Sequence, residues 1–153
     1  MRLKTLERDE AFAIEVLKNA AYATVAMVGG DGKPYCVPVN AIWSEGALYF
    51  HCAGAGEKWE ILKNDPYVCV TAVSHARVMP EHYDTAYDCA MVKGRALVLT
   101  DEAERSAAMR LIVEMLAPQE MGRLDEHMLR RMGATMLVKI VPEEITGKQN
   151  PEK

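Results

Sequence analysis

One short segment of the chain carries residue types that suit phosphate binding. Residues 53–58, Ala-Gly-Ala-Gly-Glu-Lys, join a β-like run to a helix-like run. Glycines let backbone N–H groups approach an anion, the first turn of a helix offers unpaired N–H donors, and Lys58 adds a full positive charge. The segment matches neither GxxxxGK[ST] nor GxGxxG, and its spacing alone favours an ordinary β-to-α connection. Both interpretations stay open at this stage.

Histidines supply a second set of candidates. His51 immediately precedes the glycine segment and could donate to a phosphate oxygen, although a histidine at a strand end is more often structural. His75, His82 and Cys89 follow one another at intervals of seven residues, which makes metal or haem ligation conceivable. That spacing matches no standard zinc pattern, and a solvated polar loop explains it without a ligand.

Composition limits the classes of partner. The 153 residues contain 18 Lys and Arg against 22 Asp and Glu, a formal net charge of -4. Both signs are interspersed, so no basic face attracts a nucleic acid or an anionic membrane surface. No apolar run approaches the roughly 20 residues that cross a bilayer, and the N-terminal residues lack the apolar block of a signal peptide. We therefore expect a soluble, cytoplasmic protein.

The four cysteines, at positions 36, 52, 69 and 89, form no CxxC pair and no zinc-ribbon spacing. Each lies in or beside an apolar stretch. In a reducing compartment such residues behave as small hydrophobic side chains, so we expect them to be buried rather than joined in disulfides or bound to a metal.

Periodicity predicts the helices that surround these residues. Apolar positions recur at helical spacing in residues 9–20 and again after Asp101, where Glu104 completes the form of a capping box. Two shorter helices are expected, over residues 59–64 and 124–132.

Six runs have the apolar, β-branched composition of strands. These runs are residues 23–28, 34–43, 47–52, 67–74, 86–99 and 135–141. Residues 75–84 are expected to form a polar loop, and Gly94 to kink its strand or admit a close approach. Strands joined mostly by hairpin-length loops predict a small antiparallel barrel, mainly β with peripheral helices, in a single domain over residues 1–153.

The run 34–43 differs from the other predicted strands because both of its alternating faces are largely apolar. A strand buried on one face alone would show polar residues at alternate positions. We therefore expect one face in the barrel interior and the other against a partner or a ligand. Pro38 cannot donate a ladder hydrogen bond, which indicates a bulge or an edge strand.

Seven segments carry a resemblance to a known family: residues 32–40, 46–53, 56–58, 64–69, 92–96, 101–105 and 145–148. In order along nearly the whole chain, they resemble the pyridoxamine 5'-phosphate oxidase-related flavoproteins, and within them the branch containing the nitroimidazole-resistance proteins. The resemblance implies a six-stranded split β-barrel that binds FMN, usually as a homodimer with the flavin at the subunit interface. It also implies an oxidoreductase that reduces a small organic or nitro-aromatic acceptor with electrons from NAD(P)H.

The resemblance also implies which residues contact the cofactor. Lys58 and the backbone of Gly56 and Glu57 would hold the FMN phosphate. The phosphate and ribityl path would be lined by His51, Cys52 and Ala53, the isoalloxazine would lie beside Pro38, Val39 and Asn40, and Trp59 would contact the cofactor or anchor its own helix in the core.

Two further functions remain open: a flavin-binding module without turnover, and a haem protein with His51, His75 or His82 as an axial ligand. One departure from the family bears on all of them. Where many relatives have Arg and Ser, this chain has Asp88 and Cys89. A carboxylate near a phosphate would oppose its binding, unless Asp88 faces solvent or substrate.

Overall fold

The computed structural model describes residues 3–124 and 132–153. The helices are α1 (Glu10–Asn19), α2 (Glu57–Asn64) and α3 (Glu102–Leu116), with short 3₁₀ turns at Lys4–Leu6, Pro80–His82, Pro118–Arg123 and Met132–Ala134. The strands are β1 (Glu7–Arg8), β2 (Ala23–Val28), β3 (Pro34–Val39), β4 (Ile42–Ser44), β5 (Ala47–Ala53), β6 (Tyr67–Met79), β7 (Asp84–Val98) and β8 (Thr135–Asn150). None of these helices is long and apolar enough to cross a membrane.

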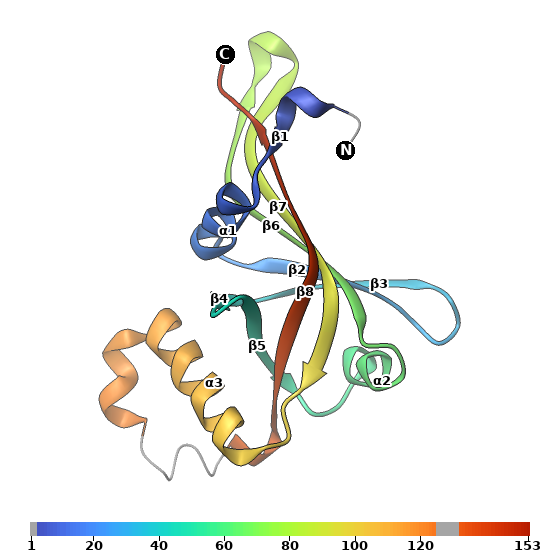
Figure 1. Cartoon of the computed structure of the whole chain (residues 1–153), viewed down its shortest axis with the longest axis vertical. Helices are drawn as coiled ribbons and strands as arrows, with labels where there is room; N and C mark the ends of the chain where they lie inside the picture. The colour runs from blue at the N-terminus through green and yellow to red at the C-terminus, as the bar shows by residue number, and fades with distance from the viewer. Residues whose placement is uncertain (1–2, 125–131) are drawn as a thin grey trace.

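All eight described strands belong to one antiparallel sheet, in the order β3-β2-β6-β7-β8-β5-β4, with β1 added to β8. β3 and β4 occupy opposite edges of this sheet although only Asn40 and Ala41 separate them in the chain. The sheet therefore curls like a barrel, yet its hydrogen-bonded ladder does not close (Figure 1).

The expectation of six strands is corrected to eight. The run 34–43 is not one strand, because the chain passes from one sheet edge to the other at Asn40 and Ala41. The second addition is the two-residue strand β1, which is too short to show any periodicity. The helix expected over residues 124–132 lies almost entirely outside the described residues.

The inner face of the sheet forms the main core, with fully buried side chains such as Phe50, Val70 and Val92. Helix α1 covers this face through Ala13, Val16 and Leu17, which are the apolar positions that predicted it. The helix begins where expected, because the side chain of Asp9 accepts a hydrogen bond from the Phe12 backbone N–H at 2.9 Å.

Helix α3 packs a second, smaller core against β4 and β5. Its apolar residues Ala108, Met109 and Ile112 are buried there. One half of the predicted capping box is present: Asp101 Oδ1 accepts from the backbone N–H of Glu104 at 2.9 Å, whereas the described residues show no return bond to the Glu104 carboxylate.

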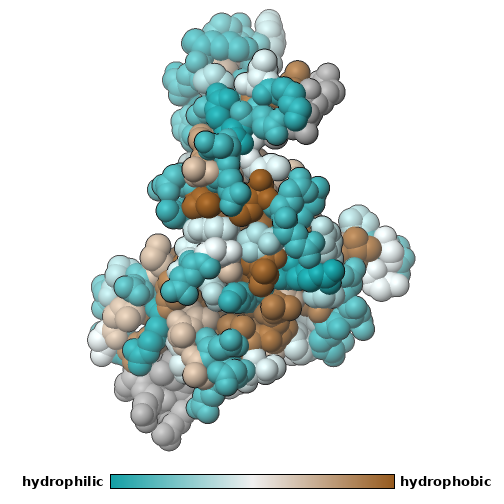
Figure 2. Space-filling view, in the orientation of Figure 1, coloured by the Kyte–Doolittle hydropathy of each residue, from teal (hydrophilic) through white to brown (hydrophobic). Residues whose placement is uncertain are grey.

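The polar segment 75–84 does not form the expected loop. β6 continues to Met79 and β7 begins at Asp84, so the two strands form a long hairpin that projects beyond the core with both chain termini beside it (Figure 1). Figure 2 shows that this end of the molecule is mostly hydrophilic. Strands that project into solvent on both faces need no apolar alternation, so their composition is that of a loop.

The same reasoning accounts for β8, which runs to Asn150 rather than ending at residue 141. Its last residues pair with the projecting part of β7, Asn150 opposite Tyr87. Hydropathy indicated only the part of β8 that lies over the core.

Asp84 ties the C-terminal residues to the projecting hairpin. Its carboxylate accepts from Lys153 Nζ at 2.9 Å, from Asn150 Nδ2 at 3.1 Å and from the Thr85 backbone N–H at 2.8 Å. These donors, the Lys153 ammonium first, lower the pKa of Asp84 from 3.8 to about 2. Because the folded state binds this proton more weakly, the contribution to stability is present above about pH 4 and is lost as the pH falls toward 2.

We therefore expect the variant Asp84→Asn to melt at a lower temperature than the parent at neutral pH, and the gap between the two to shrink below about pH 4. Circular dichroism melts across this pH range measure the gap. The matched control is Glu81→Gln, because Glu81 is a nearby carboxylate that forms no hydrogen bond with the described residues. A gap that stays constant down to about pH 2 would contradict the assignment.

Candidate functional site

The glycine segment opens a helix, as both sequence interpretations required. Gly56 is the residue before α2 and has φ 103°, a conformation that side-chain-bearing residues rarely adopt. No side chain caps the first backbone N–H groups of α2 within the described residues. A Cβ atom placed on Gly56 would meet nothing within 4 Å, so this helix start is open and can donate hydrogen bonds to an anion.

Lys58 lies in the first turn of α2 with its side chain half-buried. Its Nζ lies 5.7 Å from the centroid of the Phe50 ring, and no carboxylate of the described residues lies within 4 Å of it. Lys63, on the same helix, is instead paired with Glu60 at 2.9 Å. The start of α2 therefore combines open N–H donors with a cation that no described carboxylate neutralises.

Cys52 lies beside this cation. The side chain is 8% exposed, and its burial raises the pKa of the thiol, while the positive charge of Lys58 acts in the opposite direction. The thiol is thus neutral at neutral pH, and Cys52 forms an apolar wall next to Lys58.

His51 and Ala53 lie on the other face of β5, because successive side chains of a strand alternate. Both are exposed, and His51 is paired across the sheet with Leu137 of β8. The structure thus brings Cys52 together with Lys58 and directs His51 and Ala53 away from them.

The three residues at the end of β3 differ in exposure. Val39 is buried in the same core cluster as Phe50 and Cys52, whereas Pro38 and Asn40 are exposed. Pro38 lies on an edge strand, as expected, since β3 has a hydrogen-bonded neighbour on one side only.

Trp59 and Glu57 complete the residues that the resemblance implies. Trp59 is half-buried, and Lys63 Nζ lies 5.5 Å from its ring centroid. Glu57 is exposed in the first turn of α2. Trp59 thus contacts its own helix and only part of its surface is open to a ligand.

The histidine and cysteine candidates for metal binding are not gathered. His75 and His82 lie exposed on the projecting hairpin, where His75 Nε2 is 3.6 Å from Glu152. His51 lies on β5, which pairs with β4 and β8 rather than with the strands of that hairpin. Within the described residues, no group of three His, Cys, Asp or Glu side chains could hold a metal ion.

Asp88 is engaged inside its own chain. Its Oδ1 accepts from Gln149 Nε2 at 2.8 Å, and Gln149 Oε1 accepts in turn from Arg8 Nε at 2.9 Å. A chain of hydrogen bonds thus links the Asp88 carboxylate to the Arg8 guanidinium, so the positive charge of Arg8 partly compensates the negative charge of Asp88.

Three cysteines share the outer face of the sheet. Ala26 is paired with Cys36 on one side and with Cys69 on the other, and Val73 is paired with Cys89. Burial raises the pKa of Cys69 and of Cys89. All four thiols are free, but the expectation that all are buried holds fully only for Cys52. Cys69 and Cys89 are half-buried, and Cys36 is exposed because it lies on the uncovered face of an edge strand.

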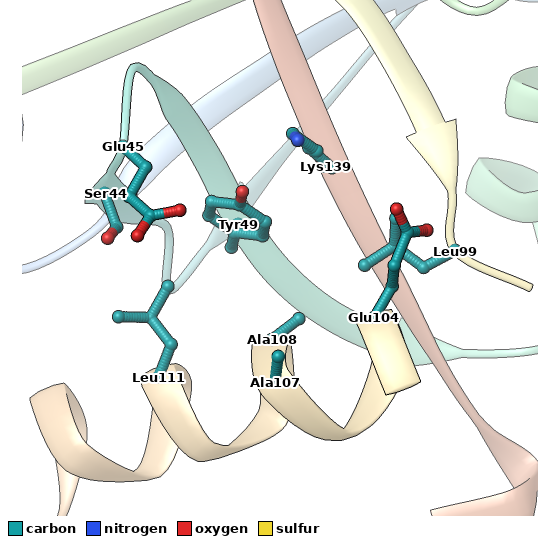
Figure 3. Close-up of a pocket in the computed structure, with 9 residues that line it drawn as sticks. All are labelled: Ser44, Glu45, Tyr49, Leu99, Glu104, Ala107, Ala108, Leu111 and Lys139. Atoms are coloured by element: carbon teal, nitrogen blue, oxygen red, sulfur yellow. The ribbon is translucent and has the colours of Figure 1, made fainter. Parts of the chain in front are cut away.

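A cavity of 230 Å³ lies elsewhere, between α3 and the β4–β5 hairpin (Figure 3). None of the residues proposed from the sequence to bind a cofactor or a metal lines it. Its charged residues are Glu45, Glu104 and Lys139. They are far apart in the chain and share no motif, so no sequence signal could have grouped them.

The curled antiparallel sheet with helices at its margins defines a split-barrel protein. The sequence profile of pyridoxamine 5'-phosphate oxidase matches residues 9–149. The chain therefore belongs to the pyridoxamine 5'-phosphate oxidase family, as the resemblance indicated. No curated protein sequence matches it significantly.

Solved structures share the fold at low sequence identity. A candidate 5-nitroimidazole antibiotic resistance protein from Bacteroides thetaiotaomicron is 22% identical, with TM-score 0.76, over 94% of this chain and 86% of that one. A flavocytochrome from Azotobacter vinelandii is 22% identical, with TM-score 0.84, over 99% and 72%. An FAD- and haem-binding protein from Mycobacterium smegmatis is 19% identical, with TM-score 0.77, over 95% and 74%.

Proposed function

We propose that the chain binds FMN and acts as an oxidoreductase that reduces a small organic or nitro-aromatic acceptor with electrons from NAD(P)H. The observation that carries the proposal is the start of α2, where the described residues leave the N–H groups uncapped and provide no carboxylate partner for Lys58. Membership of the family supports a flavin, and one relative of similar fold is a candidate nitroimidazole resistance protein.

The residues at this site fit a phosphate-bearing cofactor. Lys58 and the N–H groups that follow Gly56 would hold the phosphate, and the neutral wall of Cys52 places no opposing charge there. When bound, the flavin supplies the redox chemistry. The chain then has to bind and orient it and exclude water, so no acid–base pair is required of its own residues.

We also propose a homodimer with the flavin at the subunit interface. Within the chain, the second face of β3 is left open at Cys36 and Pro38, although its residues are apolar. Hydrophobic residues also gather over the middle of β7 and β8 in Figure 2. A second copy would cover such surfaces. Light scattering of the purified protein is expected to give twice 17.0 kDa; a monomer that retains the flavin tightly would contradict the interface.

An absorption spectrum and a turnover assay test the function. We expect flavin bands after loading with FMN, and oxidation of NADH or NADPH that depends on an added nitro-aromatic acceptor. Chromatography of the cofactor that co-purifies with the protein, released before any loading, separates FMN from FAD. Flavin bands without turnover on several acceptors would favour a binding module instead of an enzyme.

Haem is the second candidate, because two relatives of similar fold are a flavocytochrome and an FAD- and haem-binding protein. A Soret band in the same spectrum would favour it. The exposed His51, His75 and His82 would then be substituted one at a time to find the axial ligand.

A further inference from the structure

The cavity beneath the β4–β5 hairpin has an apolar floor and one aromatic wall (Figure 3). Ala107 and Ala108 of α3 form the floor together with Leu111, and the ring of Tyr49 stands above them. Because two consecutive residues of α3 are alanines here, the helix leaves room that larger side chains would fill. Neither Lys58 nor the start of α2 lines this space, so it is distinct from the proposed phosphate site.

Charged groups border the apolar floor. Lys139 Nζ lies 5.7 Å from the centroid of the Tyr49 ring, while Glu104 comes from α3 and Glu45 from the hairpin turn. Among the described residues, none of these three side chains forms an ion pair within 4 Å. Elsewhere on the surface such pairs are common, as between Lys93 and Glu144 at 2.8 Å.

The charge pattern selects the ligand. A ligand with a carboxylate and no ammonium group would be repelled by the two glutamates. A ligand with an ammonium group and no carboxylate would be repelled by Lys139. A molecule that carries both groups can pair with Lys139 at its anionic end and with Glu104 or Glu45 at its cationic end. The apolar floor and Tyr49 suit an attached ring.

The volume limits the size of that ring. A dry cavity of about 150 Å³ accommodates benzene, and the present cavity of 230 Å³ accordingly has room for a ring with a short substituent. We propose that this cavity binds a small zwitterion with an aromatic group, of the size and charge of an aromatic amino acid. This site is additional to the flavin site and does not depend on it.

Titration of the full-length protein with three related probes tests the proposal. L-Phenylalanine carries both charges, phenethylamine lacks the carboxylate, and 3-phenylpropionate lacks the ammonium group. We expect phenylalanine to bind about fivefold more tightly than either analogue, the scale of one partly exposed ion pair. Amide shifts in ¹⁵N-labelled protein should centre on α3 and β5.

Charge variants assign each end of the ligand. Lys139→Met should lower the affinity for phenylalanine about fivefold and leave the affinity for phenethylamine unchanged or higher. Glu104→Gln should lower the affinity for phenylalanine and phenethylamine and raise the affinity for 3-phenylpropionate. Glu114→Gln should leave the affinity for all three probes unchanged, because Glu114 is exposed on α3 and does not line the cavity.

Ala107→Leu keeps the fold, because Ala107 is exposed and leucine favours helix, yet it fills the cavity and should abolish binding of all three probes. Equal affinities for the three probes, no binding of phenylalanine, or amide shifts that centre on α2 would each overturn the proposal.

Discussion

Replacing Lys58 with alanine should weaken FMN binding by about 1.5–3 kcal/mol, or about 10- to 150-fold in Kd, the scale of a charge-assisted hydrogen bond. The physical reason is that Lys58 is the cation beside the open start of α2 and no described carboxylate neutralises it. Quenching of flavin fluorescence on titration with FMN measures the change.

Lys63→Ala is the matched control. Lys63 lies on the same helix, but Glu60 already pairs with it at 2.9 Å and it is far from the helix start. We expect this variant to bind FMN with nearly the parent affinity. If Lys58→Ala also leaves the affinity unchanged, the phosphate lies elsewhere and the proposed site is wrong. Riboflavin, which has no phosphate, should bind both variants and the parent alike.

Replacing Gly94 with alanine should destabilise the fold by about 2–3 kcal/mol, as overpacked positions do. A Cβ atom at Gly94 would overlap the carbonyl oxygen of Val141 and lie 3.0 Å from the Cα of Pro142. These are backbone atoms of the neighbouring strand, so no side chain can move aside. The register of β7 against β8 also shifts at this point, between Lys93 and Gly94. Chemical denaturation measures the loss.

Gly30→Ala is the control for the Gly94 variant, because a Cβ atom there meets nothing within 4 Å and φ is not in the positive range. Its free energy of unfolding should stay within about 0.5 kcal/mol of the parent. An equally stable Gly94→Ala variant would show that β7 and β8 do not approach as closely as the structure has them.

Sequence reasoning succeeded where structure depends on neighbours along the chain. The helix after Asp9 followed from the helical spacing of its apolar residues, and the start of α3 at Asp101 followed from a capping residue three positions before its target. Gly94 was singled out because a glycine inside a strand often marks a close approach, and the structure confirms it. Each of these signals is contained in a few consecutive residues.

The same reasoning failed where pairing partners are distant. Residues 75–79 belong to the segment expected to be a loop, and residues 142–150 are mostly polar, yet they extend β6 and β8 by pairing with β7. The division at Asn40 likewise depends on the two edges of the sheet, which local periodicity does not record. Hydrogen bonds between strands hold such segments, and those bonds leave little trace in side-chain composition.

By itself, the sequence singled out the candidate site at Lys58, because its cation, its glycines and its helix start are consecutive residues. It also determined the family, since the characteristic segments run through nearly the whole chain in order. Only the tertiary structure decided which neighbours act together. It placed Cys52 with Lys58 and turned His51 to the opposite face, because strand side chains alternate. It also brought Tyr49, Glu104 and Lys139 around one cavity, because α3 packs against β5 and β8, which pair in the sheet although they are far apart in the sequence.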